Sequence, residues 1–190
     1  REDYRRAGAN LSNADQEKLR VINARLAELS TAFGQNLQAD ANEGVIWVDD
    51  AKELKGLSAD AISAASVAAE SRGKPGSYAI PLVSPTLQPA LASLDNRALR
   101  ERLFKASNSR GRRGNANDNR GLIREMVALR AERATLLGFE THAEYVLADS
   151  TAQTPAAVEA LLRKVMPPAL KNAEAEACLL YTSDAADDQA

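Results

Sequence analysis

Apolar residues recur at helical spacing near the start of the chain and predict one long amphipathic helix. Successive members lie three or four residues apart, and they are Leu19, Ile22, Leu26, Leu29, Phe33 and Leu37. This spacing places the side chains along one face of an α-helix. Ser12 precedes the pattern and can cap the first turn, and Gly44 follows it. We therefore expect a helix with one buried stripe between Ser12 and Gly44.

Two short β-prone runs, 45–48 and 78–83, predict a small ribbon. Pro81 lacks a backbone donor, so the second run suits the edge of a sheet. Between the runs, Ser58 is the expected N-cap of an Ala-rich helix over 61–71. Because a two-stranded ribbon is marginal by itself, we expect it to pack against helices.

The second half of the chain predicts helices separated by turns. Asp95 is the expected cap of a helix that carries Leu99, Leu103 and Phe104 at core-type spacing. The remaining signals are a loop over 111–117, a helix from near Asp118 to Gly138 that carries Leu122, Met126 and Leu129, a short helix over 141–147, and a last helix opened by Thr154-Pro155. The predicted fold is mainly α, a helical lobe with a small two-stranded β ribbon.

Composition excludes several classes of protein. Of the 190 residues, 45% are hydrophobic and 26% are charged, which is typical of a globular chain. The formal net charge of −2 gives no general attraction to nucleic acid or anionic membranes. No apolar run approaches the roughly 20 residues of a membrane-spanning helix. Cys178 is the only cysteine, which excludes a disulfide scaffold and a Cys-rich zinc module.

The last residues differ in character from the Ala-, Glu- and Lys-rich segment before them. Cys178–Asp188 matches, codon for codon through Asp187, the translation of a transposon-type sequencing adapter. We therefore interpret 178–190 as an adapter artefact and leave it out of fold and function arguments. The chain also begins at Arg1 without an initiator Met. The expectation that follows is a fragment, cut at both ends.

Candidate chemistry is sparse. His142 is the only histidine, and Glu140 and Glu144 flank it two residues away on each side. Residues two apart point to different sides of a helix, so a metal site there is disfavoured. The chain has no H-E-x-x-H, no G-x-S-x-G and no phosphate-binding glycine motif. We assign no catalytic, cofactor-binding or metal-ligating residue.

One basic stretch allows an alternative function. Arginines and one lysine dominate residues 97–133, at positions Arg97, Arg100, Arg102, Lys105, Arg110, Arg112, Arg113, Arg120, Arg124, Arg130 and Arg133. Such a face can bind nucleic acid, or it can be a solvated helix surface that meets acidic partners. Few aromatic residues interleave with these charges, which disfavours stacking on single strands. A nucleic-acid-binding or protein-interaction module therefore stays the alternative.

Several short motifs, in order along the chain, resemble the thimet-oligopeptidase family of zinc metallopeptidases, and in particular its bacterial peptidyl-dipeptidase (dipeptidyl carboxypeptidase) branch. The motifs are Val48-Asp49-Asp50, Tyr78-Ala-Ile-Pro-Leu82, Gln88-Pro89-Ala90-Leu91, Asn117-Asp118-Asn119-Arg120, Leu136-Leu137-Gly138-Phe139, Ala143-Glu144-Tyr145-Val146-Leu147 and Thr154-Pro155. The resemblance covers essentially all of residues 1–177.

The resemblance implies a large two-lobed helical peptidase that hydrolyses short peptides and releases C-terminal dipeptides. A bacterial cytoplasmic location is implied as well, with secretion as the alternative because the N-terminus is missing. It also implies zinc, held in the family by an H-E-x-x-H helix and a later Glu whose site lies beyond this sequence. The zinc would therefore belong to the full-length parent, and the fragment should bind none and be inactive. The expected divisions are an N-terminal helical region over 1–94, the start of the catalytic domain over 95–177, and the artefact over 178–190.

Overall fold

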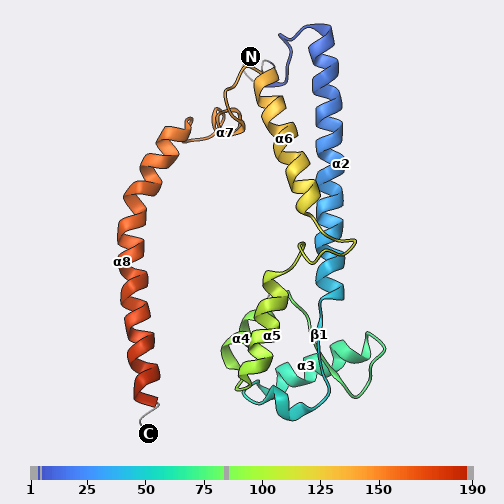
Figure 1. Ribbon diagram of the computed structural model, residues 1–190, viewed down its shortest axis with the longest axis vertical. Coiled ribbons are helices and arrows are strands. Elements are labelled where there is room, and N and C mark those ends of the chain that lie inside the picture. The colour runs from blue at the N-terminus through green and yellow to red at the C-terminus, as the bar shows by residue number, and fades with distance from the viewer. Residues whose placement is uncertain (1–3, 5, 84–85, 188–190) are drawn as a thin grey trace. The chain divides into compact units, whose positions relative to one another are not determined.

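The computed structural model describes residue 4, residues 6–83 and residues 86–187, so positions 188–190 of the expected artefact lie outside the described residues. Helices dominate the chain, with one small ribbon (Figure 1). The order is α2 (Asn13–Glu43), β1 (Ile46–Val48), the 3-10 helix η1 (Ala51–Leu54), α3 (Ala59–Glu70), β2 (Tyr78–Ile80), α4 (Leu87–Ser93), α5 (Arg97–Asn108), α6 (Arg120–Leu136), α7 (His142–Leu147) and α8 (Pro155–Asp187). The predicted fold class is confirmed.

The first helix forms as its apolar pattern predicts, with one correction. The hydroxyl oxygen of Ser12 accepts a hydrogen bond from the Asp15 N–H (3.2 Å), which satisfies a donor of the first turn. The side chains from Leu19 to Leu29 in the predicted stripe are buried. Leu37, however, is 39% exposed, because the buried stripe continues in steps of three and four through Asn36 and Asp40. The end of the stripe is therefore polar.

The two short strands pair antiparallel, as the sequence predicts. Ile46 lies opposite Ile80, Trp47 opposite Ala79, and Val48 opposite Tyr78. The second strand ends at Ile80, immediately before Pro81, which cannot donate to the ladder. The ribbon is not left to stand alone, since Ala79 is buried with Val45 and with Ala69 of α3.

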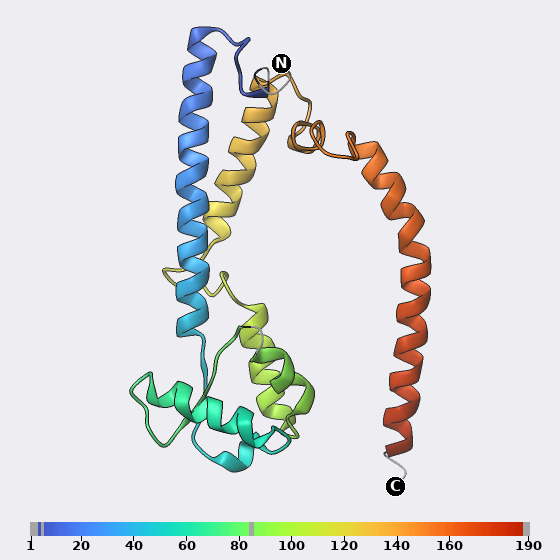
Figure 2. The ribbon, with the colours of Figure 1, turned by 180° about the vertical axis from the view of Figure 1, so that it is seen from behind.

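The principal core lies where the ribbon meets η1, α3, α4 and α5. Its buried members are Val48, Leu54, Ile80, Leu82, Leu87, Ala90, Leu94, Leu99 and Leu103. In both views α4 and α5 lie side by side (Figures 1 and 2). A close backbone approach holds this region together at Gly56, where an added Cβ would lie 2.0 Å from the Ser93 carbonyl oxygen. Gly56 also has φ +97°, which only glycine adopts readily.

The start of α5 differs from the predicted one by a residue. Asn96, not Asp95, is the N-cap, and its side-chain oxygen accepts from the Leu99 N–H at 3.1 Å. Asp95 is used elsewhere, because its N–H donates to the Lys55 carbonyl (2.9 Å) and its carboxylate pairs with Lys55 Nζ (3.2 Å).

The expected burial of Phe104 is wrong. The buried side of α5 carries Leu99 and Leu103, while Phe104 is 59% exposed. One residue corresponds to about 100° of rotation around a helix, so the ring next to Leu103 in sequence points away from the core.

The later helices begin and end at the predicted signals. α6 starts at Arg120, two residues after Asp118, and ends before Gly138, whose φ of +82° allows the Phe139 N–H to reach the Ala134 carbonyl (2.9 Å). α8 opens with Pro155 in its first turn, and the Thr154 hydroxyl accepts from the Ala157 N–H at 3.2 Å.

The chain divides into two compact units, which are described separately. One unit comprises residues 23–128 and contains the ribbon, η1, α3, α4, α5 and the principal core. The other comprises residues 1–22 and 129–190, with α7 and α8. The division falls inside α2 and inside α6. It differs in kind from the sequence-based domains, and the expected boundary between 94 and 95 stays a prediction.

Candidate functional site

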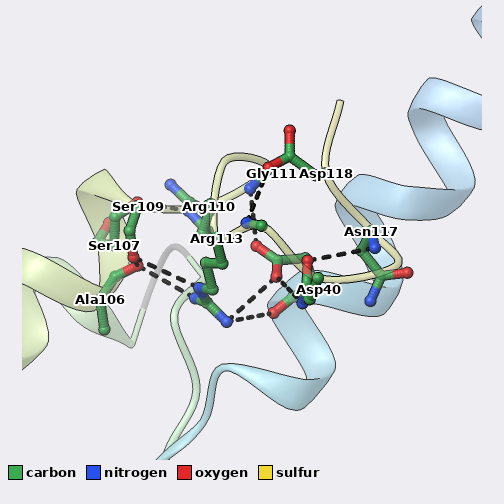
Figure 3. A network of polar contacts seen from close by, with 11 residues as sticks. Asp40, Ala106, Ser107, Ser109, Arg110, Gly111, Arg113, Asn117 and Asp118 are labelled. Carbon is green, nitrogen blue, oxygen red and sulfur yellow. Dashed lines mark hydrogen bonds and ion pairs between the residues drawn. The ribbon is translucent and has the colours of Figure 1, made fainter. Parts of the chain in front are cut away.

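The most buried carboxylate in the described residues belongs to Asp40, near the end of α2. Its side chain is fully enclosed and accepts three hydrogen bonds from the segment after α5 (Figure 3). The Gly111 N–H donates at 2.8 Å, Arg113 Nη1 lies at 3.2 Å, and Asn115 Nδ2 donates at 3.3 Å. Buried charge is costly unless it is paired and hydrogen-bonded, and Asp40 meets both conditions.

Arg113 extends the same network back to α5. Its guanidinium donates to the Asp40 carbonyl (3.3 Å) and the Ala106 carbonyl (3.2 Å) as well as to the Asp40 carboxylate. Figure 3 shows this side chain reaching from the loop between the two helix ends. Gly44 leaves the room it needs, because an added Cβ there would lie 2.4 Å from Arg113 Nη2.

A second buried polar residue, Asn119, connects α2 to the start of α6. Its side chain is 2% exposed. Its Oδ1 accepts from Asn36 Nδ2 (3.0 Å), and its Nδ2 donates to the Phe33 carbonyl (3.2 Å). Its N–H donates to the Gly111 carbonyl at 2.8 Å. Both side-chain atoms of Asn119 are therefore satisfied within the unit.

These contacts define what the network can do chemically. Every partner of the Asp40 carboxylate is a hydrogen-bond donor, and one of them carries a permanent positive charge. The oxygens of this carboxylate leave no open position for a metal ion, and solvent does not reach them, so Asp40 is not placed to act as a general base. We conclude that the network positions the loop over 111–119 against α2 and that it is a structural site.

The basic stretch of 97–133 is used largely inside the fold. Several of its guanidinium groups donate to backbone carbonyls or pair with a carboxylate: Arg100 with Leu94, Arg102 with Trp47 (3.2 Å), Arg110 with Leu82 (2.9 Å), Arg112 with Asn108 (3.0 Å), Arg113 with Asp40 and Ala106, and Arg120 with Asp118 (2.7 Å). The bond from Arg120 holds the pKa of the Asp118 carboxyl far below its usual range. Groups engaged in this way are poorly placed to neutralise phosphates, so the nucleic-acid alternative gains no support.

His142 lies half-buried in the first turn of α7, stacked on Tyr145 with ring centroids 6.1 Å apart. Its Nδ1 is buried without a hydrogen-bond partner. Burial lowers the pKa of His142, and the positive charges of Arg133 and Arg130 lower it further. The nearby Glu144 carboxylate accepts from the Glu140 N–H (2.9 Å). The positive charges of Arg133 and Arg130 close to His142 disfavour the binding of a metal cation there.

Within the described ranges, no group of three or more His, Cys, Asp or Glu side chains is arranged to hold a metal ion. A zinc site with protein ligands needs at least three such groups converging on one point. The expectation that this chain itself supplies no metal ligand and no catalytic residue stays a prediction.

Tyr145 is the centre of a cluster in the unit of residues 1–22 and 129–190. Arg6 donates to the Tyr145 carbonyl (2.8 Å), pairs with Asp149 (2.9 Å) and lies 5.4 Å from the centroid of the tyrosine ring. The guanidinium of Arg133 lies 5.1 Å from that centroid. Two cations against one ring is a cation–π arrangement, and it fastens Arg6 to α7.

A cavity of about 240 Å³ lies in the other unit, among α3, β2 and α4. Its lining is almost entirely apolar: Leu57, Ala61, Ala64, Ala65, Ala68, Ala79, Ile80, Pro81, Thr86, Pro89 and Ala90. Thr86 supplies the one hydroxyl among these residues, and no ionisable group faces the space. This cavity can accept an apolar group, but it offers no acid, base or nucleophile of catalytic strength.

Sequence reasoning missed the Asp40, Asn119 and Tyr145 clusters. A signal for the first was present, since Asn36 and Asp40 continue the alternating three-and-four spacing of the α2 stripe. A polar residue at a core position predicts a buried hydrogen-bond network. The Tyr145 cluster has no comparable signal, because Arg6 and Asp149 are far apart in the sequence.

Comparison with known proteins gives the chain its family. The pattern of Peptidase family M3 matches residues 90–186, which is half of the chain. The chain belongs to this peptidase family.

Individual relatives agree with that assignment. The dipeptidyl carboxypeptidase of Escherichia coli (strain K12) is 41% identical over 170 residues, which are 90% of this chain and 25% of that protein. The dipeptidyl carboxypeptidase of Salmonella typhimurium is 41% identical over 163 residues, 86% of this chain and 24% of that protein. Oligopeptidase A of Haemophilus influenzae is 37% identical over 160 residues, 80% of this chain and 23% of that protein. The chain thus spans about a quarter of the length of these curated relatives.

Proposed function

We propose that this chain is part of a zinc metallopeptidase that releases dipeptides from the C-termini of short peptides. The observation that carries the proposal is the 41% identity to two dipeptidyl carboxypeptidases across most of the chain. The identity to oligopeptidase A of Haemophilus influenzae is lower, at 37%. The difference favours the dipeptide-releasing branch of the family over the endopeptidase branch.

The proposal gives this chain a scaffolding role. Asp40, Arg113 and Asn119 hold the loop over 111–119 to α2, and the described residues contain no cluster of three or more His, Cys, Asp or Glu side chains arranged for a metal ion. The zinc, its ligands and the general base would come from the rest of the parent polypeptide, with residues 95–177 forming the start of its catalytic domain. A zinc ion supplies a Lewis acid and a water of lowered pKa in such enzymes. The 190-residue chain should then be inactive by itself.

A bacterial cytoplasm is the proposed location, as the family resemblance implies. Among the described residues, no helix combines the length and apolar character needed to cross a bilayer. Cell fractionation of the source organism, with an antibody to this chain, tests the location directly.

The activity is tested on the intact parent, produced by continuing the reading frame past codon 177 in adapter-free DNA. Two matched substrates are used, an N-acetylated tetrapeptide with a free C-terminus and the same peptide with an amidated C-terminus. We expect dipeptide release from the free form only, loss of activity with a zinc chelator, and recovery on adding zinc.

Cleavage of both peptides at internal bonds would instead place the parent with the oligopeptidases. A parent that cleaves neither peptide with zinc present would overturn the proposal. The 190-residue chain is the control in every assay, and peptide cleavage by it alone would overturn its scaffolding role.

A further inference from the structure

Helix α8 carries a stripe of large apolar side chains on one face. Its members recur at spacings of three, one and four residues, which the helical repeat places side by side: Val158, Leu161, Leu162, Val165, Met166 and Leu170. We refer to these six residues as the α8 stripe. The last five are between 51% and 61% exposed. No residue described within the unit of 1–22 and 129–190 covers them.

A helix of this kind needs a partner to be stable. Most helical stability in proteins comes from packing of the apolar face, because short and medium helices are marginal in water. α8 also contains Pro167 and Pro168, each of which lacks the N–H of a helical hydrogen bond. The sequence therefore weakens the helix in its middle, where the stripe is continuous, and intrinsic propensity does not compensate.

The charges on α8 disfavour a lipid surface as the partner. Basic and acidic residues balance between residues 155 and 177. The three basic ones are Arg163, Lys164 and Lys171, and the three acidic ones are Glu159, Glu174 and Glu176. One pair, Arg163 with Glu159, already forms an ion pair on the helix at 2.5 Å. Helices that lie in a membrane interface carry an excess of basic residues on the polar face, and α8 does not.

The comparisons indicate what covers the stripe. The Peptidase family M3 pattern runs through residue 186, so the whole α8 stripe lies inside the family's domain rather than in a tail. The same comparisons leave three quarters of the length of the relatives unmatched by this chain. A core-type apolar face within a domain that continues in the relatives finds its partner most directly in that continuation.

We propose that the α8 stripe is an internal docking face, covered by an apolar surface of the part of the parent peptidase that this chain does not contain. This inference rests on the proposed function in one respect, the existence of a longer parent polypeptide. It goes beyond that function by assigning the α8 stripe as the seam where the scaffold of residues 1–177 joins the rest of the enzyme.

Thiol labelling tests the seam on the full-length parent. Leu162→Cys probes the stripe and Lys164→Cys probes the opposite side of the same helix. The 190-residue chain also carries Cys178→Ser, and the native cysteines of the parent are replaced. In the 190-residue chain, both thiols should react with a maleimide at similar rates. In the parent, we expect the maleimide reaction of Leu162→Cys to be at least about tenfold slower than in the 190-residue chain, because a packed side chain reacts only after local opening. The reaction rate of Lys164→Cys should be the same in both.

A measurement without substitutions guards against a variant that fails to fold. Met166 is 56% exposed, so hydrogen peroxide should oxidise it readily in the 190-residue chain. Mass spectrometry of the parent should show Met166 oxidation slowed to a similar degree. Rapid oxidation of Met166 in a folded parent, or equal labelling of both thiols there, would overturn the proposal.

Protection in the 190-residue chain alone would also overturn it, and sedimentation velocity would then separate a second copy from another segment of the same chain as the cover. The peptidase assay on the same parent keeps the two proposals apart. An active parent in which the α8 stripe is exposed would contradict only the proposed docking face. An inactive parent in which the α8 stripe is protected from labelling and oxidation would contradict only the proposed activity.

Discussion

The principal core and helix α8 use the same kinds of side chain with opposite results. Leu54, Leu82 and Leu103 are fully buried among η1, the ribbon and α5. Leu161 and Leu162 of α8 are 60% and 61% exposed. The first region supplies its own partners from five short elements. The second presents a face of the same chemistry that no described residue of its own unit covers.

The difference teaches where the chain is self-sufficient. A region that encloses its apolar surface gains roughly 25 cal/mol per Å² that it removes from water. An exposed stripe gains little of this until a partner arrives. We therefore expect the core of residues 23–128 to fold in the isolated chain and α8 to be the most easily opened helix.

The largest expected effect separates the two regions by substitution. Leu103→Ala removes a fully buried side chain and should lower the free energy of unfolding of the 190-residue chain by about 2–5 kcal/mol. Leu162→Ala, on the α8 stripe, should change it by less than about 0.5 kcal/mol. Urea unfolding followed by circular dichroism measures both variants. Equal losses from the two substitutions would break the comparison.

The buried network should come next. Asp40→Ala leaves Arg113, whose side chain is 21% exposed, without its carboxylate partner, and should cost about 3 kcal/mol in unfolding free energy. Glu17→Ala is a matched control on the same helix, since Glu17 pairs with Arg20 at the exposed surface and its loss should leave the unfolding free energy unchanged. A small effect of Asp40→Ala would show that the network does not hold the loop.

A smaller effect on unfolding free energy, which should depend on the presence of Arg113, tests the contact at Gly44. Gly44→Ala should destabilise by about 1 kcal/mol, because the new methyl group displaces the Arg113 guanidinium from Asp40. In an Arg113→Ala background, the same substitution should be close to neutral, because the guanidinium that the new methyl group would displace is gone. A double-mutant cycle gives the coupling, and additivity of the two changes would contradict the described geometry.

The smallest effect is a pH dependence in the other unit. The pKa of His142 is lowered in the folded chain, so the unfolded chain binds a proton more readily below about pH 6.5. Stability from this group is complete above that pH and is lost as the pH falls through 6.5 towards the folded pKa. The urea midpoint should therefore drop between pH 7 and pH 5.5.

His142→Gln should flatten this slope, and the interpretation is direct because His142 is the only histidine. An unchanged slope in the variant would assign the pH dependence to other groups. Carboxylates such as Asp118 titrate at lower pH, since the pKa of Asp118 is itself lowered.

Much of the fold follows from local patterns in the sequence. Ser58 and Thr154 cap helices, Gly138 ends one, and the runs around Trp47 and Ala79 form the ribbon, because each signal acts on its own turn or strand. The errors at Asp95 and Phe104 arose where a neighbour one residue away competes for the same role. The choice between neighbouring residues for an N-cap or a buried helix face is decided by tertiary contacts, which the local pattern does not encode.

The candidate site was less predictable from sequence than the fold. Helical spacing marks Asp40 as a buried position, but its partners Gly111 and Arg113 lie some 70 residues away in the chain, and no local pattern identifies them. The family, by contrast, could be identified from short motifs, and the match over residues 90–186 confirms it. The absence of assigned catalytic residues stays a prediction, as does the interpretation of 178–190 as an artefact.

Amide hydrogen exchange of the unmodified 190-residue chain tests the central contrast most directly. Peptides from α5, which carries Leu99 and Leu103, should exchange slowly, at the level of global unfolding. Peptides from residues 158–173 of α8 should exchange much faster, and in the full-length parent they should slow to the level of α5. An α8 as protected as α5 in the isolated chain would contradict the account.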